Sequence, residues 1–265
     1  MKKQFLLPAV LLVGFATTIT SCKKDNDDAV TPSKQACSVE YILNGNDSLK
    51  VSYDSQERIS KEEVFSKSSG NSQAYVTYDY SSGKIVEKTY QGGDIQSEVN
   101  YHLNANDNVE YSVAFDKDAS GNNDFDNADT TWYLYDSDRH VTRTITHDRT
   151  DFIITQGLSK DTSWFTYSGG NLTKEERKIG TAATTTTYYT YGNNDATSEF
   201  LVPMPGDASI RNIYGKTSQK LPIAKTSDGT TVTYGYTFNS EGYVTRVDET
   251  TSGANNRTDI YYNCK

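Results

Sequence analysis

Apolar and polar residues alternate along most of the chain, and short polar turns separate the alternating segments. In residues 232–238 apolar side chains occupy every second position, which is the period of a β-strand with one buried face. A turn follows at 239–242, where Asn and Ser can bond to the local backbone and glycine can adopt positive φ. The chain then returns through a second apolar segment at 243–247. These residues therefore predict a β-hairpin.

The same hairpin pattern recurs along the chain. Each copy begins with an aromatic or aliphatic residue, continues through an Asn-, Asp- or Ser-rich turn, and ends with an aliphatic residue. Glu57 and Arg139 occupy positions where other copies carry Gly or Asp, so those two turns are poorer matches. A change of length would turn side chains to the other face unless the turn type also changed, so we expect the shorter copies to use a different turn and keep the same face. The six-residue copies are 53–59, 103–109, 135–141 and 238–244, the five-residue copies are 80–85 and 167–172, and a degraded copy begins at Tyr191.

Consecutive hairpins joined by short connections most simply form one antiparallel meander. Seven hairpins give roughly 14 strands, more than an open twisted sheet usually carries. We therefore predict an all-β fold, an antiparallel hairpin meander curled into a closed or half-open barrel, with a two-layer sandwich as the alternative. The positions expected to face outward are Thr, Ser, Asp, Lys and Glu, which argues against a membrane-spanning barrel because its lipid-facing positions must be apolar.

The N-terminal segment predicts export. Residues 1–21 combine a basic start, a short apolar run and small residues, as in a secretory signal peptide. The sequence that ends at Cys22 resembles the lipobox of bacterial lipoproteins, which implies a lipidated Cys22; an ordinary signal cut elsewhere is the alternative. Residues 22–36 are polar and predict a flexible tether.

The tether also bears on where the protein is located. Its short acidic run resembles the surface-export signal of Bacteroidetes lipoproteins. That resemblance implies an outer-membrane lipoprotein that faces the cell exterior. The alternative location is the periplasmic face of the membrane. The alternative role of the acidic run is only to keep the tether solvated.

Two further cysteines stand at the ends of the predicted domain, which spans 37–265. In an oxidising compartment Cys37 and Cys264 could form a disulfide, since closure of the meander would bring its first and last strands together. Two unrelated thiols are the alternative. A bridge across so long a loop would remove about 5 kcal/mol of unfolded-state entropy.

Residues 198–222 interrupt the repeat. This segment holds three of the five prolines together with many apolar residues. Proline argues against a central strand, and the apolar residues argue against a solvated loop. We expect an insertion that caps or plugs one end of the curled sheet; a ligand lid is the alternative.

The turn copies, the segment 215–222 and the closing hairpin at 236–246 together resemble the Bacteroidetes lipoproteins of unknown function with a porin-like fold. The hairpins also resemble tyrosine-aspartate repeats. The resemblance covers about residues 37–264 and implies a curled antiparallel sheet on an anchored lipoprotein. It implies no catalytic residue.

One loop has the spacing of a calcium site. Oxygen donors at the first, third and fifth positions, a glycine at the sixth and a carboxylate at the ninth match a calcium-binding loop, although Asn127 replaces the bidentate acid at the twelfth. An ordinary polar loop is the alternative reading. The candidate ligands are Asp116, Asp118, Ser120, Asn122 and Asp124.

The net charge and the motifs absent from the sequence limit the classes of partner and activity. Removal of residues 1–21 leaves 24 basic and 35 acidic residues, a net charge of −11, which disfavours nucleic acid as a partner. No nucleophile motif, phosphate-binding loop or His–Cys metal spacing is present in the sequence. Aromatic clusters around Trp132, Trp164 and Tyr188 could stack on sugar rings, although such residues also pair across strands.

These observations favour a non-catalytic envelope module that requires no cofactor, is anchored in the membrane through its lipid, and binds a glycan or protein or has a structural role. The alternative is an exported carbohydrate-active enzyme with a scattered carboxylate site.

Overall fold

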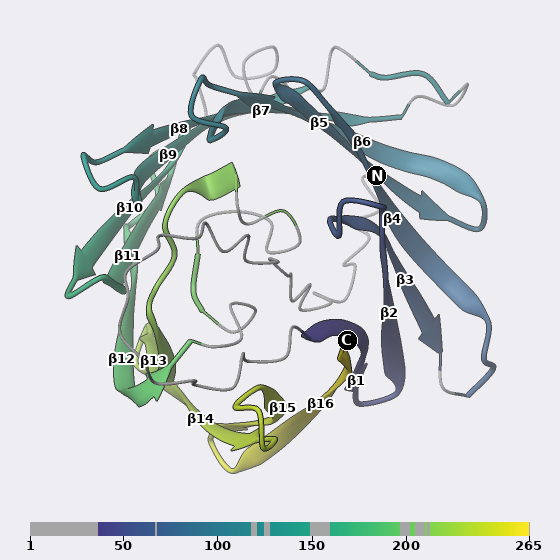
Figure 1. The fold of residues 1–265 in the computed structure, drawn as a ribbon. Helices are drawn as coiled ribbons and strands as arrows, with labels where there is room; N and C mark the ends of the chain where they lie inside the picture. The colour runs from purple at the N-terminus through teal and green to yellow at the C-terminus, as the bar shows by residue number, and fades with distance from the viewer. Residues whose placement is uncertain are drawn as a thin grey trace, which may run out of the picture.

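The computed structural model describes residues 37–66, 68–117, 121–124, 128–148, 160–196, 202–204, 210 and 213–264. They form one closed antiparallel β-barrel (Figure 1). No described helix is long and apolar enough to cross a membrane. The sixteen strands are β1 (Cys37–Asn44), β2 (Asp47–Tyr53), β3 (Ile59–Ser66), β4 (Ser72–Ser81), β5 (Lys84–Gln91), β6 (Asp94–Leu103), β7 (Val109–Asp116), β8 (Asp129–Tyr135), β9 (Val141–Asp148), β10 (Lys160–Ser168), β11 (Asn171–Ile179), β12 (Thr185–Asp195), β13 (Lys220–Ser227), β14 (Thr230–Phe238), β15 (Val244–Thr251) and β16 (Ala254–Cys264).

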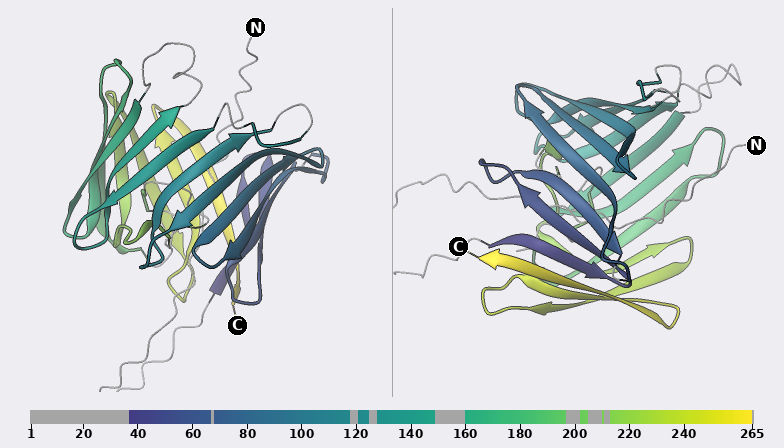
Figure 2. Two further views of the ribbon diagram at one scale, coloured as in Figure 1. Left: turned by 90° about the horizontal axis from the view of Figure 1, so that it is seen from above. Right: turned by 90° about the vertical axis from the view of Figure 1, so that its right-hand side faces the viewer.

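Each strand pairs with its neighbours in sequence, and β1 pairs with β16 to close the ring (Figure 2). The predicted hairpin meander and its closure into a barrel are therefore confirmed. Six of the seven expected turns join consecutive strands between β2 and β15, and the insertion, instead of a turn at Tyr191, connects β12 with β13. The two strands missing from the expected 14 are β1 and β16, which flank no copy of the repeat and form the closing seam.

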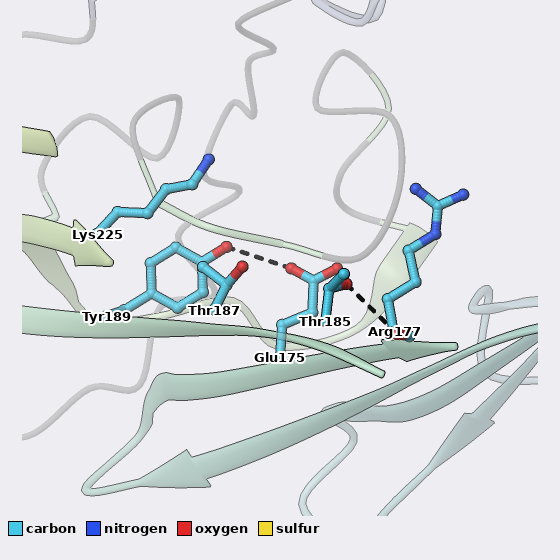
Figure 3. Close-up of a pocket in the computed structure, with 6 residues that line it drawn as sticks. All are labelled: Glu175, Arg177, Thr185, Thr187, Tyr189 and Lys225. Carbon is cyan, nitrogen blue, oxygen red and sulfur yellow. Dashed lines mark hydrogen bonds between the residues drawn. The ribbon is translucent and has the colours of Figure 1, made fainter. Parts of the chain in front are cut away.

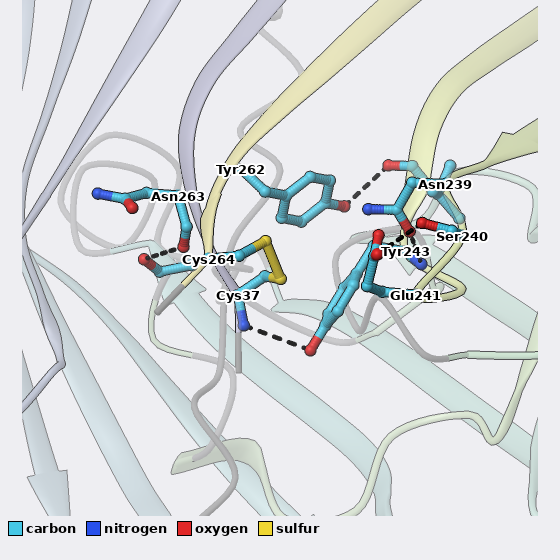
Figure 4. The surroundings of a disulfide bond; sticks show 10 residues. Cys37, Asn239, Ser240, Glu241, Tyr243, Tyr262, Asn263 and Cys264 are labelled. Atoms are coloured by element: carbon cyan, nitrogen blue, oxygen red, sulfur yellow. Dashed lines mark hydrogen bonds between the residues drawn. A yellow bond between two sulfur atoms is a disulfide. The ribbon is translucent and has the colours of Figure 1, made fainter. Parts of the chain in front are cut away.

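A disulfide spans this seam (Figure 4). Cys37 and Cys264 pair directly across β1 and β16, and their sulfurs are 2.07 Å apart. The Cys37 N–H donates to the hydroxyl of Tyr243, in the turn that precedes β15, at 3.4 Å. The first and last described residues therefore lie at the same end of the barrel as the repeat turns.

The six-residue turns share one backbone design. In the first copy the Asp54 Oδ1 accepts the backbone N–H of Gln56 at 2.8 Å and of Arg58 at 3.0 Å, while Glu57 takes a φ of 61°. Side-chain acceptors at this position replace the missing backbone partners of a tight turn. The corresponding acceptors are Asn104, Asp136 and Asn239, and the corresponding left-handed residues are Asp107, Arg139 and Gly242.

The five-residue turns keep the same face, as predicted. Tyr80 pairs directly with Ile85 and Tyr167 with Leu172, and the aliphatic partner is buried in both. A register shift lies beside the Tyr167–Leu172 pair and beside the six-residue pair Tyr53–Ile59, but not beside Tyr80–Ile85. The extra residue of the longer copies lies within the turn, where the Asp54 N–H donates to the Arg58 carbonyl, and a different turn therefore keeps the same face.

The apolar core is a ring at the repeat-turn end. Each odd-numbered strand contributes one aliphatic side chain close to its first residue, and none of the eight is more than 3% exposed. They belong to one buried cluster. The members are Val39, Ile59, Ile85, Val109, Val141, Leu172, Leu221 and Val244.

Tyrosine hydroxyls donate hydrogen bonds to backbone carbonyls of the ring residues, or of the residue next to one, and so connect neighbouring hairpins. Tyr80 donates to the Ile59 carbonyl at 2.9 Å, so that one copy of the repeat bonds to the last residue of the copy before it. Burial raises the pKa of Tyr191 to about 12, and its hydroxyl remains a donor at neutral pH. Equivalent bonds run from Tyr53 to Val39, Tyr135 to Val109, Tyr191 to Leu172, Tyr236 to Pro222 and Tyr262 to Val244.

The described residues of the insertion between β12 and β13 lie inside the barrel (Figure 1). Its described residues Val202, Ile210, Ile213 and Tyr214 are at most 5% exposed and belong to the core cluster. The Tyr214 ring packs edge-on against the ring of Tyr101, with centroids 6.4 Å apart. This end of the barrel interior is therefore filled with side chains.

Two predictions beside the insertion are wrong, the degraded turn copy at Tyr191 and the end of the insertion at Pro222. Tyr191 opens no turn, because residues 191–195 continue β12. Pro222 does not lie in a cap but in β13, opposite Tyr191, where the pairing shifts register. Proline lacks an N–H, and an irregular position in the ladder accommodates that loss.

Candidate functional site

The interior at the other end of the barrel is polar. From the buried Leu172, β11 passes a register shift and then turns Glu175 and Arg177 inward. From Tyr191, alternation along β12 turns Tyr189, Thr187 and Thr185 to the same side. Figure 3 shows these side chains rising from one face of the sheet, with Lys225 of β13 at one end of the row and Arg177 at the other.

These six residues line a cavity of about 240 Å³. We refer to it as the cup. The Tyr189 hydroxyl donates to Glu175 Oε2 at 3.2 Å, and the Thr187 hydroxyl donates to the Ser227 hydroxyl at 3.1 Å. Two walls of the cup are therefore held in place by hydrogen bonds between neighbouring strands.

The charges of the cup are balanced. Arg177 binds Asp161 of β10 through Nε at 2.9 Å, and this hydrogen bond raises the pKa of Arg177. Burial raises the pKa of Glu249 on β15, and the charge of Lys225 acts in the opposite direction. Lys225 makes no ion pair with any described residue.

Tyr189 stays a neutral hydrogen-bond donor in this setting. Burial is the largest cause that raises its pKa, and the adjacent Glu175 carboxylate adds to the effect. The cup thus combines an aromatic ring with fixed donors and acceptors. Glu175 is the one carboxylate among its lining residues. The arrangement can bind a polar ligand, and it offers no pair of carboxylates within the lining for general acid and base catalysis.

The predicted calcium ligands are only partly described. Asp118 and Ser120 lie outside the described residues. Asp116 and Asn122 are exposed, and the backbone N–H of Asp124 donates to the Asp116 carbonyl at 2.9 Å. Within the described ranges no three His, Cys, Asp or Glu residues gather as a metal site. Calcium binding stays a prediction.

A lysine already lies beside this loop. Lys117 forms a β-bridge with Asn123, its Nζ is 3.2 Å from Glu98 Oε2, and it also bonds to the Asn123 side chain. Burial acts to raise the pKa of Glu98, but hydrogen bonds from Asn100, Lys117 and Asn123 outweigh it and lower the pKa. Part of the negative charge here is thus neutralised by the protein itself.

Cys22 lies outside the described residues. The predicted aromatic clusters are divided by strand alternation, since Trp132 and Trp164 are exposed while Phe165 is buried and Tyr133 packs against the core. The cup itself was not singled out from the sequence. Its signal was the run of charged residues 174–178, which places charge on both faces of one strand.

Comparisons with known proteins bear on the fold alone. No family model matches the sequence, and no curated protein matches it. A crystal structure of a porin-like protein from Bacteroides uniformis at 2.32 Å is 16% identical with a TM-score of 0.60, covering 86% of this chain and 98% of that one. A porin-like protein from Bacteroides vulgatus is 15% identical with a TM-score of 0.56, covering 85% and 98%. The chain therefore has a porin-like fold.

Proposed function

We propose that this protein is an exported envelope lipoprotein, anchored through Cys22 and displayed at the cell exterior, whose barrel is a non-catalytic module that binds a glycan in the cup. It would then belong to the Bacteroidetes lipoproteins of unknown function that its sequence resembles. The observation that carries the proposal is the division of the interior, apolar and filled at the repeat-turn end and polar with a cavity at the other.

The chemistry of the cup suits a polyhydroxylated ligand. A sugar presents hydroxyls that both donate and accept, and the cup offers the acceptor Glu175, the donors Lys225 and Arg177, and threonine hydroxyls that do both. The Tyr189 ring adds an apolar face with a polar tip. Because Glu175 and Glu249 offset Lys225, and Asp161 offsets Arg177, a neutral ligand fits better than a highly charged one.

The outer face of the barrel supports a position outside the bilayer core. Alternation from the buried Tyr78 and Ile85 turns Asp79 and Lys88 outward, and their charged groups are 3.6 Å apart. A charged residue on a lipid-facing strand costs about 2–4 kcal/mol at the bilayer midplane. A barrel held above the membrane on residues 22–36 avoids that cost.

The binding proposal is tested with the mature chain carrying Cys22→Ser, to keep it soluble. A glycan array identifies a ligand, and calorimetry then measures the dissociation constant for wild type, Glu175→Gln and Lys225→Met. We expect each variant to weaken binding at least tenfold. The matched control is Glu176→Gln, on the same strand but on the outer face, where Glu176 pairs with Lys174 at 2.9 Å.

Two results would contradict the binding proposal: the array yields no ligand, or Glu176→Gln weakens binding as much as Glu175→Gln. The anchor is tested separately. Labelled palmitate should enter the wild type and not a Cys22→Ala variant, and protease treatment of intact cells should remove the barrel. A barrel that resists protease on intact cells would place it on the periplasmic face.

One observation favours an exported carbohydrate-active enzyme as the second candidate. Glu249 has a raised pKa because of burial and faces the same interior as Glu175, as expected of a general acid. Release of new reducing ends from the bound glycan, lost in Glu249→Gln, would establish this alternative. Unchanged glycan after long incubation would exclude it for that ligand.

A further inference from the structure

Three large aromatic side chains stand exposed on the outer wall of the barrel. Trp132 of β8 is 41% exposed, Trp164 of β10 is 37% exposed, and Tyr188 of β12 is 55% exposed. They occur on every second strand. We call them the aromatic track.

Strand register places the three residues on one diagonal line. Trp132 pairs with Ile145, whereas Trp164 pairs with Arg143, two residues along the same strand. Two strands of about 4.8 Å and two residues of about 3.4 Å separate the two backbone positions by about 12 Å. The step from Trp164 to Tyr188 repeats this offset through Glu176 and Lys174. The track therefore extends over about 23 Å and suits a linear ligand rather than a single ring.

Among the described residues the Trp132 ring makes one aromatic contact, a T-shaped one with the His147 ring, with centroids 5.1 Å apart and planes at 87°. A single T-shaped contact covers at most one face of the Trp132 ring, which is 41% exposed. The other face can stack on another flat apolar surface.

Cations lie between the aromatic rings. Arg143 separates Trp132 from Trp164, and Lys174 separates Trp164 from Tyr188. Lys160 and Lys178 lie on the same outer face, opposite His147 and Thr162. Lys174 pairs with Glu176, whereas the described residues offer Arg143, Lys160 and Lys178 no salt bridge. This wall carries an excess of positive charge on a chain whose net charge is −9.

We propose that the aromatic track binds an extended, carboxylate-bearing polysaccharide. The aromatic rings stack on the apolar faces of sugar rings, and the cations between them pair with carboxylates that recur along the polymer. The site lies on the opposite side of the wall from the cup and does not depend on it. The spacing of the track favours an acidic polysaccharide over single-stranded nucleic acid, because rings about 12 Å apart with cations between them do not form the platform on which successive bases stack.

The test uses the mature chain with Cys22→Ser and polygalacturonate as the probe. Affinity electrophoresis at several polymer concentrations gives the dissociation constant. We expect Trp132→Ala and Trp164→Ala each to weaken binding at least fivefold, and Trp164→Tyr, which keeps a flat ring, to retain most of it. Arg143→Gln should weaken binding and reduce its salt dependence.

Matched control variants show whether the loss of polygalacturonate binding is specific to the aromatic track. Tyr261→Ala removes another exposed aromatic residue, 51% exposed on β16, and should leave binding unchanged. Lys225→Met in the cup should also leave it unchanged, so that failure of this proposal and failure of the cup proposal are distinguishable. Fully methyl-esterified polygalacturonate, which lacks the charge, should bind weakly.

The proposal is overturned if polygalacturonate does not bind, or if Tyr261→Ala weakens binding as much as Trp132→Ala. Equal or tighter binding of a single-stranded oligonucleotide that depends on the same residues would assign the track to nucleic acid instead. Melting temperatures of all variants, measured in parallel, identify any loss that comes from unfolding.

Discussion

Gly215 attaches the inner segment, the described residues 202–204, 210 and 213–216 of the insertion, to the barrel wall. Its replacement by alanine tests that attachment directly. Gly215 has a φ of 75° and forms a β-bridge with His140, while the N–H of Lys216 donates to the Arg139 carbonyl at 2.9 Å. A Cβ at Gly215 would lie 2.1 Å from that same carbonyl oxygen. The backbone of one of the two segments must therefore move.

The cost follows from three contributions. A left-handed conformation costs a non-glycine residue about 1–2 kcal/mol. Loss of the hydrogen bond to Arg139 adds about 1 kcal/mol. Displacement of the packed Tyr214 ring adds about 1–3 kcal/mol. The sum is about 3–6 kcal/mol, and at about 2–4 °C per kcal/mol for a chain of this size the melting temperature falls by about 6–24 °C.

Gly229→Ala is the matched control, because Gly229 has a φ of 79° with no atom within 4 Å of the added Cβ. It should cost only the conformational part, about 1–2 kcal/mol. Thermal unfolding followed by circular dichroism compares the two variants. If Gly215→Ala destabilises the protein no more than Gly229→Ala, the inner segment is not held at this point and the reasoning fails.

Three further predictions concern the seam, a turn and the acidic loop. Replacing both Cys37 and Cys264 by serine should lower stability by about 5 kcal/mol, because the bridge closes nearly the whole domain; an unchanged melting temperature, with two titratable thiols in the wild type, would mean that the bridge does not form. In the turn at 135–141, burial acts to raise the pKa of Asp136, but its hydrogen bonds from His140 outweigh this and lower it. Asp136 therefore stabilises the fold above its unfolded pKa of about 3.9 and loses this effect as pH falls through the lower folded pKa. Asp136→Asn keeps the turn acceptor, as Asn104 and Asn239 do, so denaturant titrations should show a deficit at pH 7 that narrows below pH ~4; a deficit constant with pH would exclude the charge as its cause. Millimolar calcium should raise the melting temperature of the wild type and not of Asp116→Asn, and no rise in the wild type would refute the calcium site.

The repeat made most of the fold predictable from sequence. Its Asn or Asp acceptor and its left-handed fifth residue act within a few residues of one another, and both are visible in the sequence. The sequence indicated poorer turns at Glu57 and Arg139, and this was wrong, since both residues take the positive φ that glycine takes at Gly242. The buried face followed because Ile59 and its counterparts end every copy.

The sequence predicted a closing seam with Cys37 and Cys264 and a capping insertion, but the pairing of β1 with β16 and the end of the insertion depend on distant contacts that local patterns do not show. β1 and β16 have no turn of the repeat beside them, and their pairing joins residues 227 positions apart. Pro222 argued against a strand because the local rule considers only the missing N–H. The register shift opposite Tyr191 that accommodates it is set by another strand.

The candidate sites were harder to predict than the fold. The aromatic clusters were visible, but only the register separates Trp132 and Trp164 on the outer wall from Phe165 in the core. The cup unites side chains of three strands, and Glu175 and Lys225 are 50 positions apart. Their proximity follows from the pairing of β12 with both β11 and β13, across the insertion that separates β12 from β13 in sequence.

The connectivity also gives the barrel a direction. Cys37 and Cys264 both lie at the filled end, so a lipid at Cys22 would hold that end toward the bilayer. The cup would then open away from the cell surface. A ligand would reach it from the surrounding medium without passing between the protein and the lipid, and the length of residues 22–36 would set the distance between this open end and the membrane.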